Sequence, residues 1–175
     1  EVARRAKAFG MRVTALSAWR NREPGDAELI DAAYGVEEPA GFLAEVDYLV
    51  ACAPLVEETR GIIGERWLSQ LRPTAVLIHV GRGPVLDEAA LYHALRSKRI
   101  RGASIDVWYA YPKATDERVA PSQFPFHTLD SVVMTPHSSS RSGEAIDRRF
   151  ADVAANLDAL AKGAPLRNVV KLGRS

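Results

Sequence analysis

Residues Ala75–Val107, AVLIHVGRGPVLDEAALYHALRSKRIRGASIDV, contain a complete strand, loop, helix and strand pattern. The two ends of this stretch, Ala75–Val80 and Gly102–Val107, are short and mostly apolar, which is typical of strands buried in a parallel sheet. Between them, Asp87 can cap a helix in which apolar residues recur at intervals of three and four. The stretch therefore predicts two parallel strands that are joined by a helix.

The same alternation continues on both sides of this unit. Upstream, Met11–Leu16 and Asp47–Ala53 are predicted strands, and Asp26–Ala33 is a predicted helix. Downstream, Ser131–Met134 is the last predicted strand, and apolar residues at helical spacing predict one long helix over Arg141–Lys162. We therefore expect an α/β fold with one doubly wound, Rossmann-like parallel sheet whose two faces are covered.

Composition limits the kinds of partner. The 175 residues include 23 basic and 22 acidic ones, and this formal charge of +1 gives no electrostatic reason to expect nucleic acid or an anionic membrane. No apolar run approaches the roughly 20 residues of a membrane-spanning helix. Cys52 is the only cysteine, so no intrachain disulfide and no paired-thiol metal site can form. These features favour a cytoplasmic protein with a small-molecule partner and no metal.

Candidate functional residues follow the predicted strands. Ligands of open parallel sheets bind beyond the carboxyl ends of the strands. Those ends lead to Ser17, Pro54, Gly81–Gly83, Asp106 and Thr135–His137.

Each of the two most reactive candidates has two readings. Arg82, between two glycines, can hold a carboxylate through its planar guanidinium while the glycines let the backbone approach the ligand, or it can be part of a solvated turn. His137 can act as a general acid and base near neutral pH, or it can be an ordinary loop or core histidine. His79 and Cys52 lie within predicted strands, and we expect a hydrogen-bonded core histidine and a small buried side chain.

Five stretches in order carry a resemblance to a known family: Val2–Met11, Pro54–Gly61, Val80–Glu88, Gly102–Val107 and Thr135–His137. With these stretches, the chain resembles the NAD(P)-binding domain of the D-isomer-specific 2-hydroxyacid dehydrogenases from its first residue to about residue 170. The resemblance implies hydride transfer between a nicotinamide cofactor, NAD or NADP, and a 2-hydroxy or 2-oxo acid. A homodimer is also implied.

The resemblance also assigns roles to the residues at the strand ends. Arg82 would bind the substrate carboxylate, and His137 would donate or accept the proton. The remaining residues would lie along the nicotinamide side of the cofactor, and they are Pro54, Val80, Gly81, Asp106, Ser138 and Ser139. A non-catalytic module that senses dinucleotides or binds proteins is the alternative, because this fold also serves in corepressor-type relatives.

The chain departs from the family at its amino end. The family's glycine-rich turn, which holds the pyrophosphate, would precede Glu1, and we interpret the amino end as missing sequence. We expect residues 1–140 to be a partial dinucleotide-binding domain. Residues 141–175 would form a crossover helix and tail toward a missing substrate domain. The isolated chain is therefore expected to be inactive.

Two further departures concern specificity and catalysis. Where the family commonly has an acidic residue that binds the ribose hydroxyl, this chain has Ser17, followed by Arg20 and Arg22. This pattern suits a 2′-phosphate and favours NADP, unless the two arginines are only surface charges. Tyr111 stands where relatives usually have a glutamate that hydrogen-bonds the catalytic histidine. A neutral phenol can still orient His137, but it offers no negative charge.

Overall fold

The computed structural model describes residues 1–17, 26–37, 39–114 and 116–169. It divides into two compact units, Glu1–Pro136 and His137–Ser175. The predictions for Arg20 and Arg22 lie outside the described residues.

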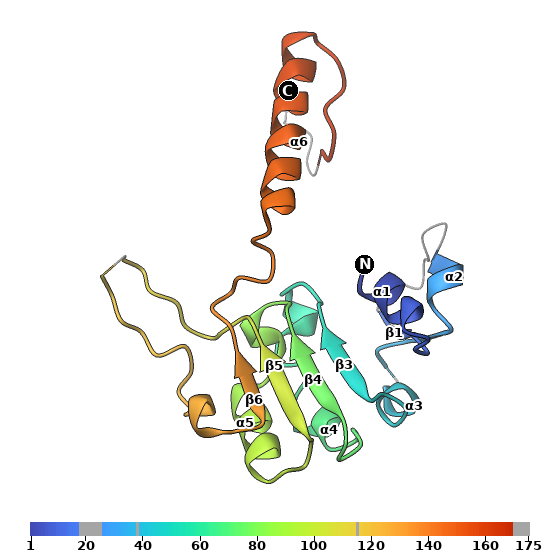
Figure 1. Ribbon diagram of the computed structural model, residues 1–175, viewed down its shortest axis with the longest axis vertical. Coiled ribbons are helices and arrows are strands. Elements are labelled where there is room, and N and C mark those ends of the chain that lie inside the picture. Colours follow the sequence, from blue (N-terminus) through green and yellow to red (C-terminus); the bar gives the residue numbers. More distant parts are fainter. Residues whose placement is uncertain (18–25, 38, 115, 170–175) are drawn as a thin grey trace. The chain divides into compact units, whose positions relative to one another are not determined.

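Parallel strands alternate with helices along the first unit (Figure 1). The strands are β1 (Thr14–Leu16), β2 (Ala32–Tyr34), β3 (Tyr48–Ala51), β4 (Val76–His79), β5 (Gly102–Ile105) and β6 (Val132–Met134). The helices are α1 (Val2–Ala8), α2 (Asp26–Leu29), α3 (Ala40–Leu43), α4 (Glu65–Leu68) and α5 (Glu88–Arg96), with short 3₁₀ turns η1 (Glu57–Thr59), η2 (Gly83–Val85) and η3 (Phe126–Thr128). The predicted Rossmann-like α/β class is confirmed.

The expectation of one continuous sheet was wrong for the described strands. β1 pairs with β2 in a two-stranded sheet, and β3, β4, β5 and β6 form a four-stranded sheet in that order. Every pair is parallel, but no described strand joins β1 to β3. The helix expected over Asp26–Ala33 was also too long, because its last part is strand β2, which pairs with β1.

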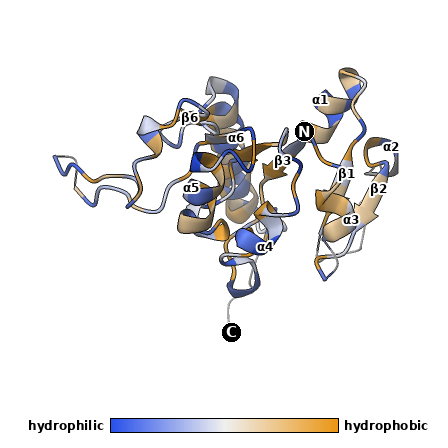
Figure 2. Ribbon diagram, turned by 90° about the horizontal axis from the view of Figure 1, so that it is seen from below, coloured by the Kyte–Doolittle hydropathy of each residue, from blue (hydrophilic) through white to orange (hydrophobic). Residues whose placement is uncertain are grey.

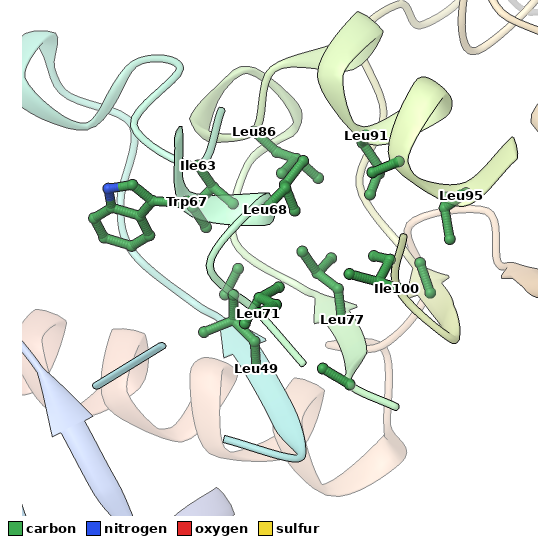
Figure 3. Packing of buried hydrophobic residues seen from close by; sticks show 14 of the residues in the cluster. Leu49, Ile63, Trp67, Leu68, Leu71, Leu77, Leu86, Leu91, Leu95 and Ile100 are labelled. Carbon is green, nitrogen blue, oxygen red and sulfur yellow. The ribbon is translucent and has the colours of Figure 1, made fainter. Parts of the chain in front are cut away.

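Apolar side chains hold the four-stranded sheet against α4 and α5. Inward residues of the strands, such as Leu49 and Leu77, point toward Leu68, Leu91 and other residues of the helices and loops (Figure 3). In Figure 2, α5 carries both hydrophobic and hydrophilic residues, as the predicted amphipathic helix requires. The Asp87 side chain accepts a hydrogen bond from the Ala90 N–H at 2.8 Å, so the predicted cap is confirmed.

The other face of the four-stranded sheet is less covered than predicted. Buried and partly exposed residues alternate along β4, and Tyr48 and Val133 are more than half exposed. Side chains of a strand point alternately to the two faces, so one face is buried against α4 and α5 and the other is only partly covered within the described chain.

The second unit is dominated by one helix. α6 (Gly143–Ala161) begins after Ser142, whose hydroxyl accepts a hydrogen bond from the Ala145 N–H at 3.2 Å. The predicted long helix is thereby confirmed with slightly shorter bounds. The Asn156 side chain then pairs with the backbone N–H and C=O of Arg167, at 2.8 and 3.2 Å, and so fixes the tail along the helix. No helix in the described ranges is long and apolar enough to cross a membrane.

Candidate active site

The register of the four-stranded sheet brings the predicted site residues of the first unit to one edge. The last residues of the neighbouring strands lie side by side in the pairing, and they are Ala51, His79, Ile105 and Met134. Figure 1 shows these carboxyl ends at a common edge of the sheet. The segments that follow carry Pro54, Arg82 with its flanking glycines, Asp106 and Thr135. The structure therefore brings the segments that follow these strands to one edge of the sheet, as the sequence predicted.

The two glycines that flank Arg82 allow three chain segments to pack closely. A Cβ added at Gly81 would lie 2.8 Å from the carbonyl oxygen of Ala53, and one added at Gly83 would overlap the carbonyl group of Trp108. Both glycines are buried, whereas Arg82 between them is exposed and donates from Nη1 to the Gly81 carbonyl oxygen at 2.7 Å. Neighbouring backbone, and not only a ligand as expected from the sequence, therefore requires glycine at these positions.

His79 is buried beneath this loop. Its side chain has no exposed surface, and its ring nitrogens lie 3.4 Å from the carbonyl oxygens of Ala51 and Gly83. Burial lowers the pKa of His79, and the backbone carbonyl groups oppose that shift. The predicted core histidine is confirmed, and it links the end of β3 to the Arg82 loop.

The ends of β5 and β6 are joined by hydrogen bonds around Asp106. The Thr135 hydroxyl donates to Asp106 Oδ1 at 2.6 Å, and the Trp108 indole N–H donates to the Thr135 carbonyl oxygen at 2.9 Å. Asp106 and Trp108 are 4% and 5% exposed. The carboxylate therefore sits in a fixed, largely water-excluded position at the sheet edge.

Tyr111 turns back onto the same segment. Its hydroxyl accepts a hydrogen bond from the Trp108 backbone N–H at 2.8 Å, although its side chain is 45% exposed. This contact lies within the loop that follows β5. The predicted action of Tyr111 on His137 stays a prediction.

His137, Ser138 and Ser139 begin the second unit, directly after Pro136. His137 has a left-handed backbone with φ of +55°. Such a conformation is uncommon for a residue other than glycine and is found preferentially at functional sites. No feature of the sequence predicted this conformation.

Ser17 is exposed directly after β1, and its N–H donates to the Tyr34 carbonyl oxygen at 3.2 Å. Cys52 is exposed and follows β3, so the expected burial was wrong, because the strand ends one residue earlier. The Tyr109 hydroxyl is buried without a partner among the described residues, and burial raises its pKa.

Comparison with known proteins agrees with this geometry. The family model described as D-isomer specific 2-hydroxyacid dehydrogenase, NAD binding domain, matches residues 1–139. The chain belongs to this family. The resemblance drawn from five short stretches is thereby confirmed.

Relatives within the 2-hydroxyacid dehydrogenase family include a glyoxylate reductase of Korarchaeum cryptofilum, which is 38% identical over 169 residues, covering 97% of this chain and 48% of that protein. The D-lactate dehydrogenase of Lactobacillus jensenii, solved with NAD⁺, superposes with a TM-score of 0.84 at 25% identity, over 98% of this chain and 52% of that one. The NADPH-dependent glyoxylate/hydroxypyruvate reductase of Sinorhizobium meliloti, solved with NADP and sulfate, superposes with a TM-score of 0.75 at 28% identity. The match covers 97% of this chain and 51% of that one. The chain thus spans about half the length of these relatives.

Proposed function

We propose that the full-length protein containing this chain transfers a hydride between a nicotinamide cofactor and a 2-hydroxy or 2-oxo acid. The observation that carries the proposal is the shared sheet edge, where a guanidinium, a buried carboxylate and the segment leading to a histidine follow neighbouring strands. Membership of a family with relatives named glyoxylate reductase supports the same reaction class.

The residues at this edge fit a nicotinamide cofactor. The Thr135 hydroxyl donates to Asp106 at 2.6 Å, and a carboxylate is a group that accepts hydrogen bonds from an N–H donor such as a carboxamide. Pro54, Val80 and Gly81 follow the adjacent strands, and Ser138 and Ser139 follow His137. The bound cofactor supplies the hydride chemistry, whereas the protein supplies placement and charge.

Arg82 and His137 would carry the substrate chemistry. The planar guanidinium of Arg82 matches the two oxygens of a carboxylate and would hold the acid at the sheet edge. His137 would give a proton to the carbonyl oxygen during reduction and take it back during oxidation.

The test is turnover by the full-length protein with a panel of 2-oxo acids, followed through NAD(P)H absorbance. Arg82→Gln and His137→Asn are each expected to lower kcat/KM by about 100-fold or more, because each removes a group that acts on the reacting acid. Matched controls are Arg66→Gln on α4 and His127→Asn in η3, elements that come before β4 and β6 in the chain. Equal kcat/KM for the site variants and the controls would overturn the assignment.

NADP is the proposed cofactor, on the basis of Ser17, Arg20 and Arg22. The full-length enzyme should show a higher kcat/KM with NADPH than with NADH, and Arg20→Ala should reduce that ratio, because a cation that pairs with the 2′-phosphate is lost. A clear preference for NADH would reject this proposal.

Tyr111 would shape the pH dependence. A glutamate at this position would favour protonated His137, whereas a phenol does not. We expect Tyr111→Glu to move the basic limb of carbonyl reduction to higher pH. A pH profile of kcat/KM measures this, with Tyr111→Phe as the uncharged control. An unmoved basic limb would reject the electrostatic account.

The organisation of the whole protein is also a proposal. Residues 1–140 would belong to the dinucleotide-binding domain and residues 141–175 to a crossover toward a substrate domain, so this chain alone would not turn over substrate. A cytoplasmic homodimer is the proposed state of the full-length protein. Sedimentation equilibrium tests the dimer, and the assay described above tests the isolated chain.

A further inference from the structure

One tryptophan, in the loop that follows β5, contacts two other loops that meet at the sheet edge. The Trp108 carbonyl group packs against Gly83, next to Arg82. Its backbone N–H donates to the Tyr111 hydroxyl, and its indole N–H donates to the Thr135 carbonyl oxygen, two residues before His137. Trp108 thus connects the segments that carry all three residues proposed to act in catalysis.

The tryptophan is itself held in place. Its side chain is almost fully buried, and its ring meets Phe126 of η3 in an edge-to-face arrangement with centroids 6.1 Å apart. Asp106, two residues earlier, binds the Thr135 hydroxyl at 2.6 Å. Thr135 therefore has its side chain bound by Asp106 and its carbonyl group bound by Trp108, while its N–H donates to Ile105 at 3.0 Å.

The indole bond holds the carbonyl group of Thr135, two residues before the histidine. The Thr135 N–H and hydroxyl contacts belong to the junction of β5 and β6, whereas the carbonyl group of Thr135 begins the peptide that leads to Pro136 and His137. Loss of the indole donor would remove this restraint on the peptide, and displacements of about 1 Å near reacting groups can cost roughly 100-fold in rate.

We propose that Trp108 is a positioning residue for the hydride-transfer reaction: its indole N–H fixes the Thr135 carbonyl group and so orders the segment that follows β6 and leads to His137. The proposal rests on the function proposed above. It predicts an effect on the chemical step, with little effect on substrate affinity, because the indole bond holds the segment before His137, whereas Trp108 meets Gly83, next to Arg82, through its backbone carbonyl group.

The experiment uses the full-length protein with Trp108→Phe, which keeps an aromatic ring and removes the donor. Trp67→Phe is the matched control, because Trp67 is also buried but belongs to α4. Three quantities are measured: amide hydrogen exchange of residues 135–139 without cofactor, kcat and KM for the 2-oxo acid, and the primary isotope effect on kcat with deuterated cofactor.

For Trp108→Phe we expect faster exchange over residues 135–139, a kcat about 10-fold lower, an unchanged KM and a larger isotope effect on kcat. A merely structural role would lower the fraction of active protein and leave the isotope effect unchanged. Exchange, kcat and isotope effect equal to those of Trp67→Phe would overturn the positioning role while the proposed function stands. Absence of nicotinamide-dependent turnover in the wild type would remove the proposed function and this inference together.

Should Trp108→Phe fail to fold, β-(3-benzothienyl)alanine at position 108 replaces the N–H by sulfur and keeps the shape of the indole. The same rise in exchange and isotope effect supports the proposal, and wild-type values overturn it.

Discussion

The amino-terminal layer, which contains α1, β1 and β2, and the four-stranded sheet are stabilised by different interactions. Among the described residues, every buried residue lies between Pro39 and Phe126, and none belongs to α1, β1 or β2. The amino-terminal layer relies instead on polar contacts: Lys7 binds the Asp31 carboxylate at 2.6 and 2.7 Å, and Arg12 pairs with Glu45 next to α3. Leu16 and Tyr34 add partly buried contacts with the core.

The difference matters for function, because the two regions would serve opposite ends of the cofactor. Ser17 and the proposed phosphate-binding arginines follow β1, whereas Arg82 and Asp106 follow strands of the four-stranded sheet. Exposed ion pairs contribute little and are screened by salt, whereas apolar burial is not. The region proposed for chemistry is therefore the more rigid one, and the region proposed to select the cofactor is the more easily opened.

The largest expected effect compares two leucines. Leu77→Ala removes a fully buried side chain from β4, and we expect a loss of about 2–5 kcal/mol in the free energy of unfolding. Leu16→Ala on partly buried β1 should cost less than half of the loss measured for Leu77→Ala. Urea unfolding measures both. Equal losses would show that the two regions share one core.

A smaller effect concerns pH and the buried histidine. Because burial lowers the pKa of His79, the unfolded chain binds a proton at this histidine more readily than the folded chain does. Stability is therefore retained above the unfolded pKa of about 6.5 and is lost as the pH falls toward the lower folded pKa.

Urea unfolding of wild type and His79→Gln across this pH range measures the difference. His127→Gln, which changes an exposed histidine in η3, is the control. The same pH slope in wild type and His79→Gln would contradict a neutral buried imidazole.

The smallest effect should be confined to the amino-terminal layer. The hydrogen bond from Lys7 lowers the pKa of Asp31, and the Val13 N–H also donates to this carboxylate at 2.7 Å. The ionised Asp31 carboxylate therefore contributes to the free energy of unfolding above its unfolded pKa of about 3.9, and this contribution is lost as the pH falls through the lower folded pKa. Asp31→Asn should therefore speed amide exchange in α1 and β1 by roughly 2- to 10-fold, on the order of the energy of one exposed charged contact.

Exchange in β4 should stay unchanged in Asp31→Asn, and Asp130→Asn in an exposed loop is the control. Equal acceleration in β4 would mean that the two regions open together, which would remove the distinction drawn between them.

Apolar runs predicted strands where burial dominates, but not where pairing alone makes the strand. Ala75–Val80 and Gly102–Val107 became β4 and β5 within two residues at each end. Ala32–Tyr34 is only three residues long and has no alternation of its own, so its strand character comes from pairing with Thr14–Leu16. Cys52 was misjudged by one residue, because an apolar run does not mark where the backbone ladder stops.

Some features of the site were likewise predictable from the sequence, and others were not. The strand-end rule placed Arg82, Asp106 and Thr135 at one edge from the sequence, and the family was recognisable from the motifs around them. The contacts among these segments were not predictable: the packing of Gly83 against Trp108 and the bond from its indole to Thr135 join residues up to 27 positions apart along loops of irregular path.

The sequence by itself determined the parallel α/β class, the family and the types of residue at the sheet edge, because apolar periodicity and motif order are local properties of the chain. Only the tertiary structure decided that the described strands form two sheets, that His79 is buried against backbone carbonyl groups, and that Trp108 connects segments at the sheet edge. These features depend on hydrogen bonds and close packing between distant segments, whose partners are fixed only when the chain is folded.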